Sequence, residues 1–349
     1  MFFFLFSLSF LTLFHSGFSA TAEEGTSKKR VVILAGMIKT GSSAAQRMLH
    51  FNRQKLKEQG VSYPHEVTEK PGKEDLRFYQ NVYPARVDVE SLCTKASSTG
   101  CLTLLLSSEN FFRVPNLSKP FLRFVDTTVV VAVRDFYPHI WSIYQEFMKW
   151  TKGSYMTFEE YVAEGALFKK KDHYDNLFDF MRRYPNVKFE FFNFDKHRAH
   201  IVDTLLEKGH LPLDLTGFDR LDQDLVNRAL TASEHHLITF LWKQGVSPDK
   251  RRDCIDAFYK ATTEGVSYKL LVRPILEEMY AKHRALAERI NTYLVEEEHL
   301  LTEAPQEIRG FVEEVPLEIQ ETDWEIVVKI IPKIASKKAL LEKEGFRFV

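Results

Sequence analysis

Hydrophobic residues gather in four short runs, each of which predicts a β-strand. Three runs are continuous and aliphatic, as is typical of interior strands in a parallel sheet; they span residues 31–35, 102–106 and 127–133. A fourth, aromatic run spans 187–192. Apolar positions with helical spacing lie between and after the runs, at 43–59, 140–150, 174–183 and 233–244. Strands alternating with helices predict a doubly wound α/β sheet that binds ligands at the carboxyl ends of its strands.

The last part of the chain has a different pattern. Residues 277–298 predict a long charged helix with one apolar face. Beyond residue 300, prolines interrupt a mixed acidic and aliphatic stretch that ends in an amphipathic segment at 334–341. We therefore expect one domain over residues 31–300 with a helical second half. Residues 301–349 would form a C-terminal appendage, packed on that domain or partly mobile.

The first 22 residues form a separate segment. An apolar run from Phe2 to Phe14 is followed by Ala20-Thr21-Ala22, which is the arrangement of a cleavable secretory signal. The run is shorter than the ~20 apolar residues of a membrane span. An uncleaved anchor is the alternative, because the cations of this region follow the run rather than precede it. Residues 23–30 would be a linker, and the globular part would lie in a lumen or outside the cell, with membrane contact only if the segment is retained.

Composition narrows the range of partners. The 349 residues are 44% hydrophobic with a net charge of -1, which favours a large core and gives no reason to expect nucleic-acid binding. The basic cluster 250–252 is typical of a solvated helix end. Cys93 and Cys101 could form a disulfide in an oxidising compartment, leaving Cys254 unpaired. No Cys/His spacing suggests a metal, and the adjacent pair His235-His236 is expected to face solvent.

An anion-binding loop is predicted directly after the first strand. The stretch Gly36-Met37-Ile38-Lys39-Thr40-Gly41-Ser42-Ser43 passes from a strand into a helix, where free N–H groups and the helix dipole favour an anion. In an ATP or GTP loop the lysine directly follows the second glycine. Here Lys39 comes two residues before Gly41, and therefore does not match that pattern.

A second motif follows the third aliphatic strand. Arg134 stands at the strand end, and Ser142 follows eight residues later in a predicted helix. An arginine supplies a fork of N–H donors for phosphate oxygens, and a serine adds a neutral donor. Together, Arg134 and Ser142 could hold a phosphate group.

In this order the motifs resemble the 5′-phosphosulfate loop and the 3′-phosphate motif of P-loop sulfotransferases, most of all bacterial-type and Golgi carbohydrate enzymes. Weaker similarity extends over residues 31–296, at 52–64, 106–109, 227–231 and 280–294. The resemblance implies a P-loop-type parallel sheet flanked by helices, and 3′-phosphoadenosine 5′-phosphosulfate as co-substrate without a metal. It implies sulfuryl transfer to a hydroxyl or amine, foremost on a glycan, in the Golgi lumen or outside the cell. The implied donor-binding residues are Gly36, Lys39, Thr40, Gly41, Ser42, Ser43, Arg134 and Ser142, with Lys39 also catalytic.

Several residues could accept the proton of the acceptor hydroxyl, a step that such transfer requires. Asp75 lies in an acidic-x-x-aromatic-aromatic element that resembles the one carrying the base in heparan-type enzymes. Glu109 directly follows a buried strand and should face the same crevice as Arg134. His65 and Glu66 are a third option, whereas Gln46 is expected to be an exposed helix residue.

Two other functions remain open at the level of the sequence. A P-loop nucleotide kinase or NTPase would need a magnesium-binding carboxylate and a glycine before the lysine, where Ile38 stands instead. A non-catalytic nucleotide-binding relative could also keep the fold and its motifs. The presence of Lys39, Arg134 and Ser142 favours the enzyme.

Overall fold

The computed structural model describes residues 29–37, 39–64, 89–108, 126–151, 154–164, 172–219, 229–261 and 269–349. Its elements in chain order are β1 (Arg30–Leu34), α1 (Ser42–Phe51), α2 (Arg53–Glu58), β2 (Val61–Ser62), α3 (Val89–Ser98), β3 (Thr103–Ser107), β4 (Asp126–Val133), α4 (Phe136–Trp150), α5 (Phe158–Ala163), α6 (Asp172–Arg183), β5 (Lys188–Asn193), α7 (Phe194–His197), η3 (Arg198–His200), α8 (Ile201–Lys208), α10 (Ala232–Lys243), α11 (Pro248–Lys260), α12 (Arg273–Asn291), η4 (Glu296–Glu298), β6 (Glu318–Ile319), α13 (Glu321–Ile330), η5 (Pro332–Lys337), α14 (Lys338–Lys343) and β7 (Arg347–Phe348).

The central sheet confirms the predicted α/β fold. Its five strands run in the order β2-β3-β1-β4-β5, and every neighbouring pair is parallel. All four predicted strands are present, and the two-residue β2 is added at one edge. The chain leaves β1 towards β2 and leaves β4 towards β5, so the sheet has a switch point between β1 and β4. A crevice at such a point is the usual ligand site of an open α/β sheet.

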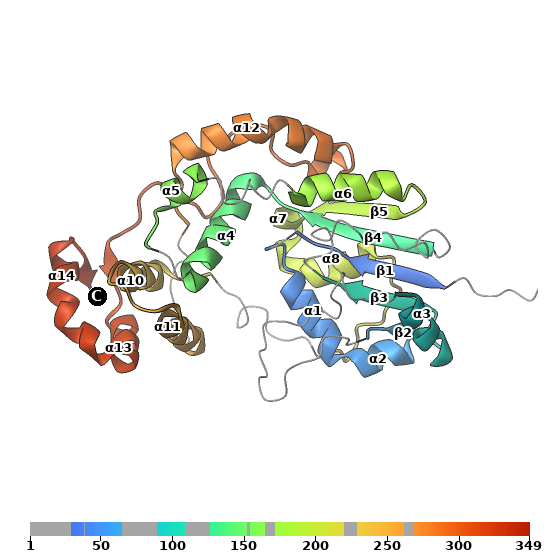
Figure 1. The fold of residues 1–349 in the computed structure, drawn as a ribbon, viewed down its shortest axis with the longest axis horizontal. Helices are drawn as coiled ribbons and strands as arrows, with labels where there is room; N and C mark the ends of the chain where they lie inside the picture. The colour runs from blue at the N-terminus through green and yellow to red at the C-terminus, as the bar shows by residue number, and fades with distance from the viewer. Residues whose placement is uncertain are drawn as a thin grey trace, which may run out of the picture.

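The two faces of the sheet pack into different cores. Val32 and Leu34 pack with residues of α1, α2 and α8, whereas Val31 and Ile33 pack with residues of α3, α4, α6 and α12. This division follows from the alternation of side chains along a strand. Figure 1 shows the sheet between these layers, with α4 leading from it to a group of helices formed by α10, α11, α13 and α14.

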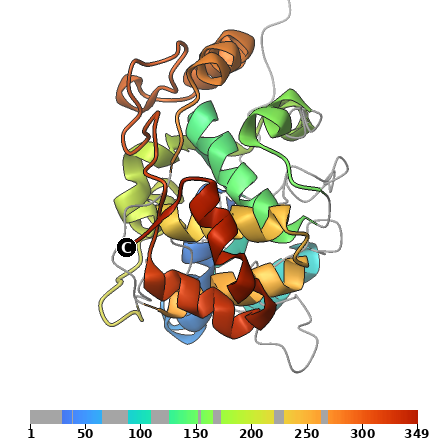
Figure 2. The same ribbon diagram turned by 90° about the vertical axis from the view of Figure 1, so that its left-hand side faces the viewer.

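The helical group includes most of the C-terminal segment. Trp324, Val327 and Leu341 are buried in the same core as Leu237 and Ile238 of α10, so this part of the chain is packed rather than detached. Figure 2 shows α13 and α14 lying beside α10 and α11. The short strands β6 and β7 pair in parallel and hold the segment together.

Some predicted boundaries are wrong, and the hydrogen bonds of two asparagine side chains explain two of them. The helix predicted over 43–59 is interrupted at Asn52, whose Nδ2 donates to the Met48 carbonyl at 2.8 Å while its Oδ1 accepts from the Asp219 N–H at 2.9 Å. The helix predicted over 277–298 instead spans Arg273–Asn291, because Asn291 exchanges two hydrogen bonds with the backbone of Leu300. The segment predicted at 334–341 divides into η5 and α14.

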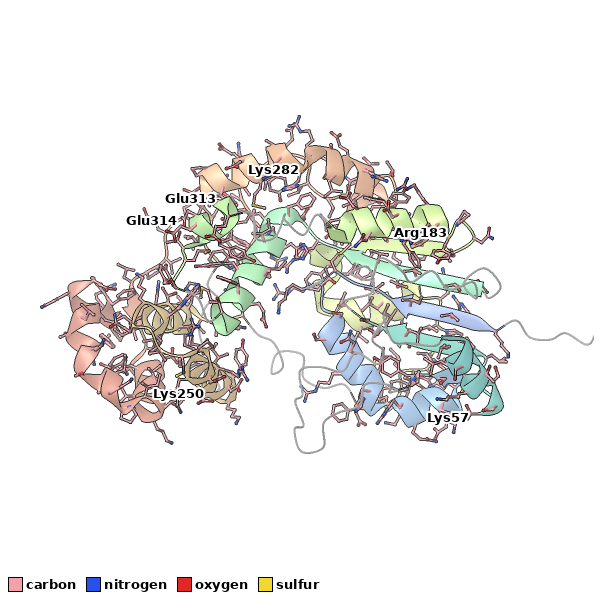
Figure 3. The ribbon with its side chains drawn as sticks, in the orientation of Figure 1. Lys57, Arg183, Lys250, Lys282, Glu313 and Glu314 are labelled. Carbon is pink, nitrogen blue, oxygen red and sulfur yellow. The ribbon has the colours of Figure 1, made fainter. Side chains whose placement is uncertain are left out.

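Charged side chains of both signs project from the outer helices and loops. Figure 3 labels Lys57, Arg183, Lys250, Lys282, Glu313 and Glu314, which belong to both halves of the molecule and are all exposed. Among the described helices, none has both the length and the apolar character needed to cross a bilayer.

Candidate functional site

The loop after β1 has a left-handed backbone at two positions. Gly41 has a φ of 75°, and Lys39, which carries a side chain, has a φ of 66°. A Cβ atom on Gly41 would lie 2.7 Å from the ring of Phe194, so a glycine is needed there for space as well as for conformation. Backbone strain of the kind seen at Lys39 tends to be kept at functional sites.

Backbone donors of this loop point to anion binding. The N–H groups of Lys39, Thr40 and Gly41 donate no hydrogen bond within the part of the chain that the structure describes. The Thr40 hydroxyl donates to the Met37 carbonyl at 2.6 Å, and a Cβ on Gly36 would lie 2.6 Å from that hydroxyl oxygen. The loop therefore folds tightly and presents three amides next to the N-terminus of α1.

Arg134 joins the loop to α4. Its Nη1 donates to the Lys39 carbonyl at 3.1 Å and to the Ser142 hydroxyl at 2.8 Å. Its Nε donates to the two carboxylate oxygens of Asp195 at 3.0 and 3.2 Å, and the Phe194 ring centroid lies 5.0 Å from the guanidinium carbon. Nη2 makes no hydrogen bond with the described residues, so two donors of the fork remain for a ligand.

Positive charge concentrates around this arginine. Burial is the main reason why the pKa of Arg134 lies below its ordinary value, and Arg198 lowers it further while Asp195 opposes the change. The pKa of Lys269 is also lowered, first by burial and then by the charges of Arg198 and Arg134, with a smaller effect from Arg309. Arg198 and Arg134 thus oppose the charge of Lys269, with a smaller effect from Arg309, while Asp195 partly offsets them; a phosphate group placed among these cations would relieve the repulsion.

The chain after α12 closes the same edge of the sheet. Asp135, next to Arg134, accepts a hydrogen bond from the Leu301 N–H at 2.9 Å. Glu298 accepts one from the N–H of Asn193, the last residue of β5, also at 2.9 Å. Burial raises the pKa of the Asp135 carboxyl, and the Leu301 N–H reduces the shift.

Lys39 is paired with a carboxylate that the sequence reasoning missed. Its Nζ lies 2.8 Å from Oε2 of Glu146, which stands four residues after Ser142 on α4. Lys149 lies 3.9 Å from the same oxygen and donates to the Tyr259 hydroxyl at 2.7 Å. Burial alone would lower the pKa of Lys149, but Tyr259 and Glu146 outweigh it and raise that pKa. The i, i+4 spacing of Ser142 and Glu146 could have indicated one shared helix face.

The structure thus brings the loop together with Arg134 and Ser142. Of the loop residues 36–43, it describes all but Ile38. The candidate bases Asp75 and Glu109 lie outside the described residues, as do His65 and Glu66, so the identity of the base stays a prediction. Asp195, Arg198, Lys269 and Arg309 were not found from the sequence. Asp195 directly follows Phe194 after the fourth strand, and this position at a strand end was its one available signal.

Three expectations about exposure are wrong. Gln46 is buried, and its Nε2 donates to the Ser107 hydroxyl at 3.0 Å. His235 is buried and stacks on Trp141. Arg251 is 1% exposed, donates to the Thr151 carbonyl and lies over the Trp242 ring. Each of the three side chains makes a contact distant in sequence: a hydrogen bond for Gln46, ring stacking for His235 and a bond to a carbonyl for Arg251.

The cysteines and possible metal ligands give no further site. Cys93, Cys101 and Cys254 form no disulfide, so the possible bridge between the first two is absent from the structure. Within the described ranges, no group of three or more His, Cys, Asp and Glu side chains is arranged to hold a metal. A cavity of about 210 Å³ lies on another face of α4, between Trp141, Phe158, His235 and Phe346, and none of the predicted donor-binding residues lines it.

Comparisons with known proteins give only distant structural similarity. A search of protein-family models and a search of curated protein sequences each found no match. Among solved structures, the chain is similar to a crystal structure of a sulfotransferase from Alicyclobacillus acidocaldarius. The match covers 75% of this chain and 94% of the other, with a TM-score of 0.38 and 12% identity. Similarity this distant does not establish an activity, so the function has to be argued from the site.

Proposed function

We propose that this chain is a sulfotransferase that moves a sulfuryl group from 3′-phosphoadenosine 5′-phosphosulfate to a hydroxyl or amine acceptor. One observation carries the proposal: Arg134 donates at once to the Lys39 carbonyl and to the Ser142 hydroxyl. The motif expected for the 5′-phosphosulfate and the motif expected for the 3′-phosphate therefore touch each other, at the switch point between β1 and β4. A donor that carries both groups could bridge them.

Each part of the donor has fitting residues. The amides of Lys39, Thr40 and Gly41, with Gly36, Ser42 and Ser43 shaping the turn, would hold the 5′-phosphate at the N-terminus of α1. The Nη2 donors of Arg134 would hold the 3′-phosphate, with Arg198, Lys269 and Arg309 adding positive charge. The Ser142 hydroxyl donates to the Pro138 carbonyl at 2.9 Å in this structure, so it would have to turn its proton to the phosphate to join them. The Lys39 ammonium would neutralise charge that develops on the leaving phosphate, a task that a metal ion performs in many phosphoryl transfers.

The acceptor and the base belong to the proposal as well. The acceptor hydroxyl must lie in line with the sulfur and the leaving oxygen, and a carboxylate, Asp75 or Glu109, would take its proton. A glycan acceptor and a lumenal or extracellular location are supported by the family resemblance and by the secretory-type segment at residues 1–22. Loss of transfer in Asp75→Asn or in Glu109→Gln, with donor binding retained, would identify the base.

Ligand binding tests the donor assignment directly. Thermal shifts of the wild-type chain are compared with 3′-phosphoadenosine 5′-phosphate and with ATP plus magnesium, and then repeated for Arg134→Gln. We expect the bisphosphate to stabilise the wild type more than ATP does. In the variant, loss of a hydrogen bond to a charged group should weaken binding of the bisphosphate by about 10- to 100-fold. Arg183→Gln, which changes an exposed arginine of α6, is the matched control.

Two results would favour the kinase or NTPase alternative over the sulfotransferase. One is tighter binding of ATP with magnesium than of the bisphosphate. The other is equal binding of the two ligands that Arg134→Gln leaves unchanged. Transfer of labelled sulfate to a panel of glycans, tyrosine peptides and small alcohols then tests catalysis. Binding of the bisphosphate without transfer to any acceptor would favour the non-catalytic alternative.

A further inference from the structure

The ion pair between Lys39 and Glu146 changes the charge that the loop offers to a ligand. The two side chains are 30% and 35% exposed, so both can be reached from solvent. No other carboxylate in the described part of the chain lies within ion-pair distance of Lys39. Glu146 also stands one helical turn beyond Ser142, on the face of α4 that meets the loop.

We propose that Glu146 makes the loop selective for a donor whose terminal group carries one negative charge over a donor whose terminal group carries two. This inference rests on the proposed function and deepens it. A terminal sulfuryl group carries one negative charge, whereas a terminal phosphoryl group carries close to two at neutral pH, because its second pKa is about 6. A carboxylate beside the lysine opposes the second charge and leaves enough positive charge for the first.

The groups that surround Glu146 fit this role. Lys39 faces it from the loop, and Lys149 faces it from the next turn of α4, 3.9 Å away. Lys149 is itself held by Tyr259, so Glu146 keeps a cationic neighbour when Lys39 turns towards a ligand. Without Glu146, the Lys39 ammonium would face the terminal group with no carboxylate beside it, and the loop would favour a dianion.

Three nucleotides that differ in one group allow a direct test with the full chain. They are 3′-phosphoadenosine 5′-phosphosulfate, the isosteric 3′-phosphoadenosine 5′-diphosphate, and 3′-phosphoadenosine 5′-phosphate, which lacks the terminal group. Dissociation constants are measured by calorimetry for the wild type, for Glu146→Gln and for the control Glu342→Gln, which removes the same charge from an exposed position on α14. Glutamine has a helix propensity close to that of glutamate, so α4 should be retained.

We expect the wild type to prefer the phosphosulfate. In Glu146→Gln, the preference for the phosphosulfate over the diphosphate should fall by about three- to tenfold, because one carboxylate no longer repels the additional charge of the diphosphate at this partly exposed position. The bisphosphate has a 5′-phosphate that is itself terminal and close to dianionic, so it should bind somewhat more tightly to Glu146→Gln than to the wild type. The behaviour of Glu342→Gln should stay close to wild type. Near about pH 5.5 the terminal phosphoryl group becomes mostly a monoanion, so the wild-type preference should shrink there as well.

The outcomes separate the two proposals. If none of the three nucleotides binds, the proposed function is wrong. If all bind but the preference is unchanged in Glu146→Gln, or changes equally in Glu342→Gln, the role of Glu146 is refuted while the donor assignment stands. A wild-type preference for the diphosphate over the phosphosulfate would also refute the role of Glu146.

Discussion

Substitution of Gly41 by alanine tests the geometry of the anion loop. Gly41 has a φ of 75°, and an added Cβ would lie 2.7 Å from Phe194 and 2.9 Å from Ile201. The left-handed backbone costs a residue with a side chain about 1–2 kcal/mol. Overpacking against the two side chains should cost a further ~1–3 kcal/mol. We therefore expect Gly41→Ala to lower the free energy of unfolding by about 2–5 kcal/mol.

Gly60 provides a matched control for this prediction. Its φ is 77°, nearly the same, but no atom lies within 4 Å of the position that an added Cβ would take. Gly60→Ala should therefore cost only the backbone contribution of about 1–2 kcal/mol. Equilibrium unfolding in urea measures both variants against the wild type. Equal losses in the two variants would refute the argument that Phe194 and Ile201 determine the residue at position 41.

Two further predictions concern buried polar side chains. Gln46→Ala should lower the free energy of unfolding by about 1–3 kcal/mol, because the hydroxyl of Ser107 loses a buried partner. The exposed control Gln54→Ala should change it by less than about 0.5 kcal/mol, and equal urea midpoints for the two variants would contradict the prediction. Burial, and then the charge of His236, holds the pKa of His235 well below its usual range. The folded chain therefore keeps the imidazole neutral, whereas the unfolded chain protonates it below about pH 6.5. Stability should therefore fall as the pH drops through that value, and His235→Gln should show a smaller fall between about pH 7.5 and about pH 5.5 in the same assay.

The sheet could be predicted from the sequence because its strands are buried on both faces. Continuous aliphatic runs such as 127–133 are hard to place elsewhere in a fold. The edge strand β2 was missed because two residues, Val61 and Ser62, show no periodicity. Helix ends were less accurate, since Asn52 and Asn291 end helices through contacts with residues that only the folded chain brings near.

The candidate site was predictable only where its residues lie beside strand ends. Lys39 and Arg134 follow β1 and β4, and the parallel order of those strands brings them together. Glu146 and Lys269 were missed because a charged residue in a helix or loop usually faces solvent, and only the fold shows which charges meet. Gln46 and His235 were placed on the surface for the same reason, although both are buried, Gln46 against Ser107 and His235 against Trp141.

The closure of the sheet edge by the chain after α12 has a consequence for synthesis. The loop and Arg134 lie in the first half of the chain, whereas Lys269, Arg309 and the backbone contact of Leu301 with Asp135 come much later. A growing chain therefore contains the loop and Arg134 well before the cations and the contacts around Arg134 can form. A chain that ends before residue 301 has neither Arg309 nor the Leu301 contact with Asp135, so the surroundings of Arg134 depend on residues made last.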